Sequence, residues 1–543
     1  MTPDDSGTEP GAGTIASAWA PLRTALFRNL WIATIVSNVG TWMQDVGAGW
    51  LMTSLSSSPS LVALVEAADS LPVMFLALPA GAIADIMDRR RLLIGVHFYL
   101  LAIAGALALS TWLGLTTAWL LLGFIFMLGI GAALAMPAWA AIVPDLVPTD
   151  ELSSAVALNS VGINVSRAIG PAIAGVLVAA VGPWFVFMLN ALSYIGILTV
   201  LLRWRRDRVK NALPAERFAS AIRVGFRFVM HTRSLQAVLI RGLAFFIFAS
   251  ATWSLFPLIV RRELGRGPEI YGLLLTCIGI GAVGGAFALP RLRVLFTRDA
   301  MVAGATVLYA LAAVMLAHVH NLALLAMAML ATGVAWISIL SALQIAAQLT
   351  LPAWVRARGI AAFVIVLMGG MSIGSILWGQ VATHIGIPST LTTAAVGLVA
   401  AIALTWRYKL GLHEALDFTP SQDWPVPALA ESPEPDRPVM VTIEYRIQAD
   451  KRTEFVSAMQ AVGEMRKRNG AYFWDLYHDP GDPTRHVECF MDESWVEHLR
   501  QHERASVADR EIQRRAKVYL AKGESTRTSH WLADRPVEDS AAG

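Results

Sequence analysis

The stretch Gly81-Ala-Ile-Ala-Asp85-Ile-Met-Asp-Arg89-Arg90-Arg91 lies between two long apolar segments of the chain. So short a polar stretch between two such segments predicts a turn that joins two membrane helices. Clusters of Lys and Arg in short loops resist translocation and stay on the cytoplasmic side of a membrane. The stretch therefore predicts a polytopic membrane protein and sets the orientation of the two adjacent spans.

The composition supports this interpretation for most of the chain. Of its 543 residues, 55% are hydrophobic and only 15% are charged, whereas a soluble domain carries about 25% charged residues. The charged residues are concentrated after Asp436, so the first four-fifths is membrane-like and the last fifth resembles a soluble domain. The net charge of +3 is small and reflects cytoplasmic loops, so we expect no nucleic-acid partner.

Segments of about 20 apolar residues can cross a bilayer as helices. Twelve segments meet this criterion, at 29–52, 60–83, 92–112, 117–140, 154–180, 184–203, 235–259, 269–289, 300–317, 322–348, 359–383 and 388–407. Basic residues gather in alternate loops, which predicts that both termini are cytoplasmic. The exception is the group Arg261, Arg262 and Arg266, on the opposite side.

The two groups of six spans show an internal repeat. A shift of 204 residues superimposes four pairs of glycines, which are Gly81 and Gly285, Gly170 and Gly374, Gly175 and Gly379, and Gly182 and Gly386. Two six-helix halves in parallel repeat are an architecture of secondary transporters. We expect a polar N-terminal segment (1–27), a six-helix bundle (28–203), a cytoplasmic connection (204–234), a second six-helix bundle (235–409), a Pro-rich linker (410–437) and a cytoplasmic α+β domain (438–535).

The last of these regions has the pattern of a small soluble domain. Strands are predicted at 439–447, 471–477, 486–491 and 526–532, with helices at 450–468 and 494–521. The order βαββαβ is that of a ferredoxin-like fold. His498 and His502 are four residues apart and could share a helix face as metal ligands do. No Cys or third His stands at a fitting spacing, so a solvated helix face is preferred, and neither a metal nor a cofactor is expected.

Polar side chains inside a bilayer are costly and usually face a cavity or one another. Burial favours the neutral form of a carboxyl group, which can then exchange a proton near neutral pH. Asp45, Glu66 and Asp69 are therefore candidates for proton coupling, against the alternative that they lie at the outer interface or pair with Arg241. The candidates for a substrate cavity are Asn38, Gln44, Asn159, Asn164, Arg167, Arg241 and Gln344.

The stretch at Gly81 resembles the loop between helices 2 and 3 of the major facilitator superfamily. The resemblance implies that Asp85 pairs with arginines when the cytoplasmic side is shut. The usual partner in span 4 is absent, which leaves Arg356 or Arg358. The alternative is that Arg89 and Arg90 only anchor the topology. Gly170-Pro171-Ala-Ile-Ala-Gly175 resembles the Gly-Pro-x-x-Gly-Gly motif of exporters in this superfamily, although the motif is physically a seam of small residues.

Further motifs resemble the transmembrane secretion effector branch, which includes the bacterial enterobactin exporter. They are Ser37-Asn-Val-Gly-Thr41-Trp42-Met43-Gln44, Pro144-Asp-Leu-Val-Pro148 and, near the C-terminus, Arg468-Asn-Gly470. The resemblance implies export of a small amphipathic molecule, a siderophore or a drug, from the bacterial plasma membrane by proton antiport.

Two other functions compete with transport. One is a membrane sensor or scaffold whose output is the C-terminal domain, and the other is a transporter fused to a small monooxygenase-like enzyme. A scaffold needs neither an internal repeat nor dispersed polar residues in its spans. No pairing of a nucleophile with a base is visible in the C-terminal domain, and a fold alone does not carry a function. We therefore expect no enzyme, and a domain that serves as an accessory with a sheet available for dimerisation.

Overall fold

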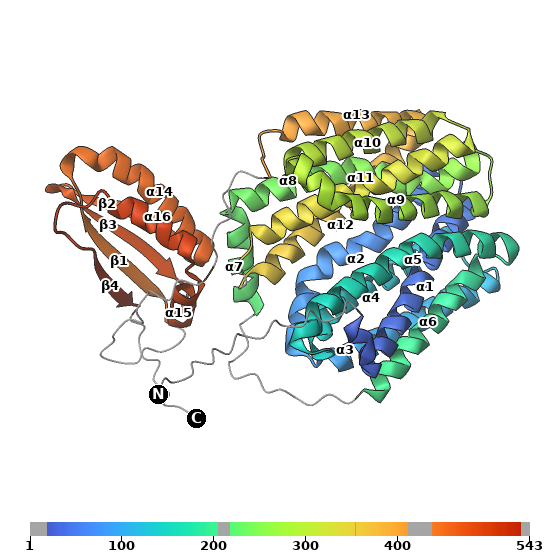
Figure 1. The fold of residues 1–543 in the computed structure, drawn as a ribbon, viewed down its shortest axis with the longest axis horizontal. Helices are drawn as coiled ribbons and strands as arrows, with labels where there is room; N and C mark the ends of the chain where they lie inside the picture. The colour runs from blue at the N-terminus through green and yellow to red at the C-terminus, as the bar shows by residue number, and fades with distance from the viewer. Residues whose placement is uncertain (1–18, 205–217, 353, 411–418, 420–436, 534–543) are drawn as a thin grey trace, which may run out of the picture.

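Long helices make up the first part of the chain in a computed structural model that describes residues 19–204, 218–352, 354–410, 419 and 437–533. They form two sets of six (Figure 1). The first set comprises α1 (Ala25–Leu55), α2 (Pro59–Ile86), α3 (Arg89–Trp112), α4 (Ala118–Ile142), α5 (Leu152–Ala180) and α6 (Pro183–Arg203). The second comprises α8 (Arg233–Leu258), α9 (Pro268–Leu295), α10 (Arg298–His318), α11 (Leu322–Leu349), α12 (Arg356–Ile385) and α13 (Ile387–Thr405).

Each helix coincides with one predicted span to within a few residues, apart from the longer C-terminal end of α9. Among the described residues, 11 helices are long and apolar enough to cross a membrane, and α1 is not in that set. The α1 helix has 31 residues, so length is not the reason. It carries Asn38, Gln44 and Asp45 along with its apolar residues, and these lower its hydropathy.

The two sets pack by the same scheme. In the first set α1 packs on α5 and α6, and α2 packs on α4; in the second set α8 packs on α12 and α13, and α9 packs on α11. The sets meet where α2 packs on α12 and where α5 packs on α9. The 204-residue shift relates α2 to α9 and α5 to α12, so these two contacts are equivalent. The repeat seen in the sequence is therefore also present in the packing.

Two glycines of the repeat have the same structural role. Gly182 and Gly386 precede α6 and α13 with φ angles of 107° and 81°. A side chain is strained at such φ values, and glycine is not. Each is followed within two residues by a proline, which suits the first turn of a helix because that turn does not use its N–H. The repeat therefore preserves a helix start that only glycine adopts easily.

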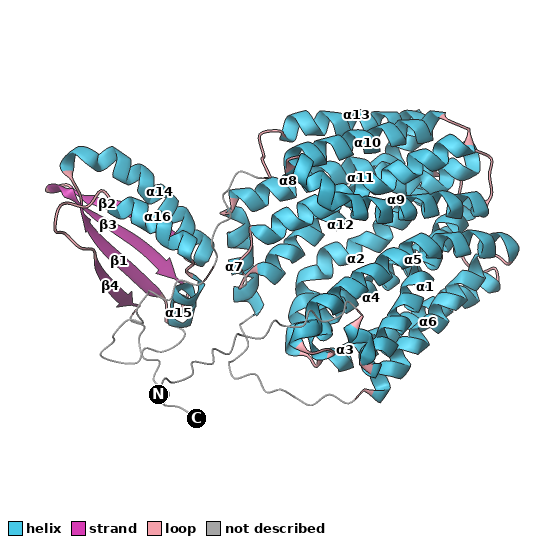
Figure 2. Cartoon of the chain, in the orientation of Figure 1, coloured by secondary structure: helices cyan, strands magenta, loops and turns pink. Residues whose placement is uncertain are grey.

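The C-terminal domain is a sheet with helices packed against it (Figure 2). Its elements are β1 (Val439–Arg446), α14 (Arg452–Asn469), β2 (Phe473–Asp479), β3 (Asp482–Asp492), α15 (Trp495–Arg504), α16 (Val507–Lys517) and β4 (Arg527–Leu532). The strand order is β2-β3-β1-β4, with antiparallel neighbours throughout. Val441, Tyr445, Phe455 and Phe490 are buried in its core.

The prediction of a single helix at 494–521 is wrong in one respect, because the segment forms two helices, α15 and α16. Ser506 begins α16 with a capping box: its hydroxyl accepts from Asp509 N, and the Asp509 carboxylate accepts from Ser506 N at 2.9 Å. Ser and Asp are good N-terminal caps because they satisfy backbone donors at a helix start. The sequence therefore breaks the helix at Ser506.

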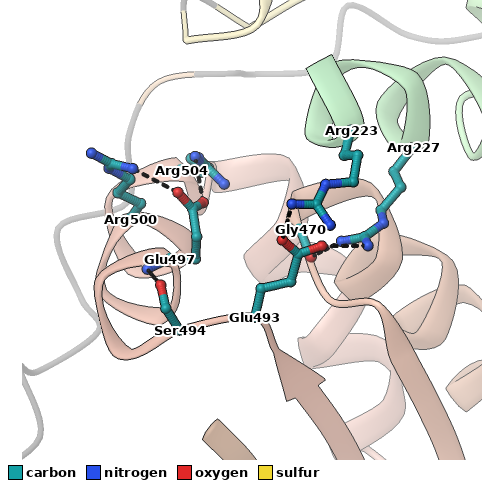
Figure 3. Close-up of polar contacts among 8 residues, drawn as sticks. All are labelled: Arg223, Arg227, Gly470, Glu493, Ser494, Glu497, Arg500 and Arg504. Carbon is teal, nitrogen blue, oxygen red and sulfur yellow. Dashed lines mark hydrogen bonds and ion pairs between the residues drawn. The ribbon is translucent and has the colours of Figure 1, made fainter. Parts of the chain in front are cut away.

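A helix that the sequence did not predict, α7 (Phe218–Met230), joins the bundle to this domain. Figure 3 shows Arg227 of α7 donating to Gly470 O at 2.9 Å and to Glu493 Oε1 at 2.7 Å, with Arg223 3.3 Å from Glu493 Oε2. His231, just after α7, contacts Glu464 at 2.7 Å.

A cation–ring contact extends this attachment. The Arg504 guanidinium lies 4.7 Å from the ring centre of Trp354, which precedes α12, and Trp354 packs edge-on against Phe228 of α7. Glu497 holds Arg504 with an ion pair of 3.1 Å (Figure 3). The domain is therefore attached to α7 and to the segment before α12, both adjacent to the second set of helices.

Candidate functional site

A cavity of about 240 Å³ lies between the two sets of helices. Its charged lining residues within the described part of the chain come from the first set, and they are Asp45, Glu66, Asp69 and Arg167. With a rise of about 1.5 Å per residue, Asp45 and Asp69 each stand roughly 15 Å from the nearer ends of α1 and α2. This is about half the thickness of a bilayer core, so the three carboxyl groups predicted for proton coupling share one cavity near mid-bundle.

The carboxyl groups in this cavity are available to a ligand. Asp45 and Asp69 are solvent-exposed although they lie inside the bundle, and Glu66 is partly exposed. Within the described part of the chain, no side chain donates a hydrogen bond to these three carboxyl groups. Arg241, the alternative partner, instead forms an ion pair with Asp299, so the structural pairing considered for the carboxylates is wrong.

Arg167 is the one cation among the described lining residues of the cavity. Its guanidinium lies 5.5 Å from the ring centre of Trp42. Its Nε is buried and, among the described residues, has no hydrogen-bond partner. A buried donor without a partner is costly, so this nitrogen is suited to a ligand or to water within the cavity.

The second set of helices supplies an aromatic and thioether wall that the sequence did not identify. It consists of Trp253, Tyr271, Trp336, Met368 and Met371, together with smaller apolar residues. Aromatic rings bind apolar ligands and cations, and methionine adapts to irregular shapes. The signal in the sequence was the presence of Trp253 and Trp336 within predicted spans.

Two of the amide candidates lie in a different cavity. Asn38 and Asn159 line a space of about 610 Å³ between α1, α4 and α5. Its other lining residues include Phe27 near the start of α1 and Val143 just after α4. This second cavity is therefore at the end of the bundle on which the C-terminal domain lies, called the domain side below.

The remaining substrate candidates lie outside the lining of both cavities. Gln44 is buried and accepts from Asn190 Nδ2 at 2.7 Å, which joins α1 to α6. Asn164 donates to Ser160 O of its own helix at 2.8 Å. Arg241 is held by Asp299, and Gln344 is exposed on α11. None of the four is brought to the central cavity.

The glycines of the predicted export motif lie at close helix crossings. A Cβ at Gly170 would be 2.6 Å from the Cβ of Trp42. A Cβ at Gly175 would be 2.7 Å from Pro268 O and 3.1 Å from the Cα of Gly272. Pro171 lies inside α5, between the two. The second of these crossings joins the two sets of helices, so the motif is a packing seam where α5 meets α9.

Several hydrogen bonds join the two sets between mid-bundle and the end opposite the domain side, called the far side below. Ser70 and Ser372 contact each other at 2.6 Å near the cavity. At the far side Ser60 contacts Thr383 at 2.9 Å, and Arg261 donates to Thr53 at 3.0 Å. Arg261 belongs to the group that broke the loop-charge pattern, and its position shows that it joins the two sets at that end.

In the stretch from Gly81 to Arg91, two arginines bind helix ends. Arg89 donates to Ala141 O at 2.9 Å, and Arg90 donates to Leu201 O at 2.7 Å and to Leu202 O at 3.1 Å. These carbonyls belong to the last turns of α4 and α6. Gly81 lies in α2 with open space beside it.

The pairing predicted for Asp85 stays a prediction. The backbone of Asp85 belongs to α2, but its side chain lies outside the described residues. Arg356 is exposed at the start of α12. The side chain of Arg358 lies against Gly225 of α7, with its Cβ and Cδ each 3.2 Å from where a Cβ of that glycine would stand.

Comparisons with known proteins agree with this architecture. A family model described as transmembrane secretion effector matches residues 16–537. The chain is 27% identical over 257 residues to the staphyloferrin A transporter of Staphylococcus aureus, which covers 47% of this chain and 64% of that protein. It is 23% identical over 243 residues to macrolide efflux protein A of Streptococcus pyogenes, covering 43% and 58% respectively. The chain thus spans less than two thirds of the length of these two relatives.

A longer alignment is found with the multidrug efflux pump Tap of Mycobacterium bovis, at 23% identity over 411 residues, which covers 72% of this chain and 94% of that protein. Among solved structures, a bacterial homologue of the lysosomal transporter Spinster, in an inward-facing conformation, has a TM-score of 0.56 at 14% identity. It covers 73% of this chain and 98% of its own. The nucleoside transporter NupG has a TM-score of 0.61 at 11% identity, with 70% and 99% covered.

Proposed function

This chain belongs to the transmembrane secretion effector family of the major facilitator superfamily, and on that premise we propose that it exports small amphipathic cations in exchange for protons. The observation that carries the proposal is the central cavity. Three carboxyl groups and one arginine face an aromatic and methionine wall there. Such a lining suits a ligand with an apolar body and a positive charge.

The relatives support efflux without fixing the substrate. Their names include a siderophore transporter, a macrolide efflux protein and a multidrug pump. An excess of carboxyl groups in the cavity favours a cationic drug-like molecule over an acidic siderophore, because like charges repel in a site of low dielectric constant. The same carboxyl groups are suited to exchange protons, because ionisable groups inside transporters commonly form proton relays.

We further propose the arrangement in the membrane. All twelve long helices span it, with α1 as the polar member that contributes Asp45. The domain side faces the cytoplasm of a bacterial cell and both termini lie there, because Arg89, Arg90 and Arg91 lie at that end. The contacts between the two sets then close the outer side, which makes this an inward-facing state. The C-terminal domain has the strand order of a ferredoxin-like fold.

The residues of the gating stretch keep their proposed roles in this scheme. Gly81 and Asp85, with Arg356 or Arg358, would form a latch on the cytoplasmic side in the outward-facing state.

The exposed face of the C-terminal sheet carries Tyr477 and Trp531, which are 50% and 54% exposed. We propose that this face pairs with a second copy of the chain, and the mass of the detergent-solubilised protein measures whether it does.

Transport into inverted membrane vesicles tests the main proposal. An imposed proton gradient should drive accumulation of a lipophilic dye cation such as ethidium, and should not drive a dye anion of similar size. We expect Asp45→Asn, Glu66→Gln or Asp69→Asn to lower gradient-driven uptake about tenfold, which corresponds to the loss of about 1.4 kcal/mol. Asp150→Asn is the matched control, because Asp150 is exposed at the domain side outside the cavity lining.

The outcomes separate the parts of the proposal. If all three variants keep the dependence on the proton gradient, proton coupling through these carboxyl groups is wrong. Uptake of the dye anion in preference to the cation would overturn the substrate class while leaving transport itself intact.

A further inference from the structure

We propose that the C-terminal domain holds a transition-metal ion of the zinc(II) type, bound by His498, His502 and His530. The first two residues lie on α15 and the third on β4. Their candidate ligand atoms all lie within 4.8 Å of one another. The site lies between α15 and the sheet, away from the transport cavity, and does not depend on the proposed transport function.

The histidines do not form the solvated helix face that the sequence predicted. His498 is 1% exposed, and His502 and His530 are partly buried. The sequence missed the third histidine because His530 is far along the chain from α15. Strand β4 brings it there: His530 pairs with Val441 of β1, whose side chain is buried in the core, so the His530 side chain projects from the same face of the sheet.

The distances suit tetrahedral coordination. His498 and His502 are four residues apart on one helix, so their side chains lie on the same face. Their Nε2 atoms are 3.2 Å apart. Two nitrogens bound to one tetrahedral zinc at about 2.0–2.1 Å are separated by about 3.3 Å. The pair is therefore already spaced as two ligands of one ion, with His530 as the third ligand and a fourth position for water.

A carboxylate orients the central ligand. Asp492, at the end of β3, has its Oδ2 2.9 Å from Nδ1 of His498, and both side chains are almost fully buried. If Nδ1 donates its proton to this carboxylate, Nε2 of His498 keeps its lone pair for the metal. Metal-binding histidines usually have such a partner, which fixes the tautomer and makes the ring a better ligand.

An aromatic side chain covers the histidine cluster. The ring of Trp495 lies 5.4 Å from His498 and 6.0 Å from His530, measured between ring centres, so it shields the cluster on one side.

The alternative is a hydrogen-bonded chain from Asp492 through His498 to His502 with no metal. This hydrogen-bonded chain accounts for the 3.2 Å separation and for the buried carboxylate, but it does not include His530, which then only packs against the rings of His498 and Trp495. Replacing His530 therefore separates the two interpretations.

Metal content of the full-length protein tests the site. The chain is purified in detergent by a tag that contains no histidine, dialysed against a chelator, and reloaded with zinc or cobalt(II). We expect about one ion per chain and, with cobalt, the intense visible absorption of a tetrahedral site. His502→Ala and His530→Ala should each weaken zinc binding at least tenfold. His478→Ala is the control, because His478 is an exposed histidine of the same domain.

A second variant protects the test against misfolding. His502→Cys should keep the metal and add a thiolate-to-cobalt charge-transfer band, which only a direct ligand produces. Zinc should also raise the Tm of the wild-type chain and not that of His530→Ala, because a ligand stabilises only the state that binds it. The proposal is overturned if the wild-type chain retains no zinc or cobalt, or if His530→Ala retains as much as the wild type.

Discussion

Arg89 and Arg90 show how individual residues fix the domain side of the first six helices. The last carbonyls of a helix have no partner within the helix, and a positive charge there also opposes the negative end of the helix dipole. Arg89 supplies a hydrogen-bond donor and a positive charge to the end of α4, and Arg90 supplies the same to the end of α6. Asp88 caps the start of α3, because its carboxylate accepts from Arg91 N at 2.9 Å. Three helix ends are thus held together by consecutive residues, which is a structural role in addition to any effect on topology.

His486 gives the C-terminal domain a dependence on pH. It lies on β3 and is 2% exposed, and burial is the largest cause that lowers its pKa, with a smaller contribution from Arg452. The folded-state pKa lies below the unfolded value of about 6.5. The contribution of neutral His486 to stability is therefore complete above about pH 6.5 and is lost as the pH falls below it.

We expect His486→Phe to reduce the fall in the Tm of the domain between about pH 6.5 and pH 5, because phenylalanine takes no proton. Calorimetry on the detergent-solubilised chain measures this. His478→Ala is the comparison and should reduce the fall less, because His478 makes only a small contribution to the lowered pKa of His486. An equal fall in Tm for the wild type and His486→Phe would contradict the prediction.

The candidate site could be predicted from the sequence only in part, and the reason is physical. Charged residues are rare in apolar segments, so Asp45, Glu66 and Asp69 were identifiable without a structure. Trp253 and Trp336 were not, because an aromatic residue inside a span packs in the core as readily as it lines a cavity. Which of these occurs depends on how the helices are rotated, and that is set by packing between segments far apart in the chain.

At the scale of elements, the long helices were predictable because a segment of about 20 apolar residues that crosses a membrane has to satisfy its own backbone hydrogen bonds, and a helix does so. Helix α7 was missed for the opposite reason. It is a 13-residue helix in a basic connection, and a helix this short depends on what it packs against. Its partners are Trp354 and Glu493, which follow it by more than a hundred residues, so nothing local indicated it.

The crossing of α5 and α9 at Gly175 is the element contact most sensitive to a side chain. A Cβ there meets the backbone of α9 at Pro268 and Gly272, and backbone cannot move aside as a flexible side chain can. We therefore expect Gly175→Val to separate the two sets at the far side. The predicted result is loss of transport in a chain that still folds, because the far side cannot close.

Labelling of a buried cysteine measures this separation. Ala63→Cys is placed in a chain whose two cysteines are replaced by Cys277→Ala and Cys489→Ala. Ala63 is fully buried against Gly379 of α12, so reaction with an impermeant maleimide reports opening. Gly175→Val should speed labelling about tenfold. Gly304→Val is the matched control, because Gly304 has open space beside it on α10. Unchanged labelling in Gly175→Val would show that the seam is not part of the closure.

At the scale of the whole molecule, the C-terminal domain is attached through α7 and Trp354, next to the second set of helices. Transporters of this architecture work by moving one half against the other. On the proposed function, with the domain fixed beside the second half, the first half would move relative to both.

The ion pairs between α7 and Glu493 should contribute measurably to the free energy that holds the C-terminal domain against α7. Arg227 and Glu493 are 22% and 24% exposed in their side chains, so the pair is partly screened by solvent. We expect Glu493→Ala to cost about 1 kcal/mol, which corresponds to roughly fivefold faster hydrogen–deuterium exchange in the backbone of α7. Glu524→Ala is the control, as an exposed carboxylate of the same domain. Equal exchange in the two variants would mean that other contacts hold the domain.

On the proposed function, the division of the cavity lining between the two halves has a consequence for how drug resistance would evolve. Among the described residues, the charged lining residues come from α1, α2 and α5, and the ring and thioether wall comes from α8, α9, α11 and α12. On the proposed function, selection for a differently charged drug would place mutations in the first half of the coding sequence. Selection for a larger or smaller drug would place them in the second half. Recombination between related genes near the segment that encodes α7 would then exchange charge preference and size preference independently.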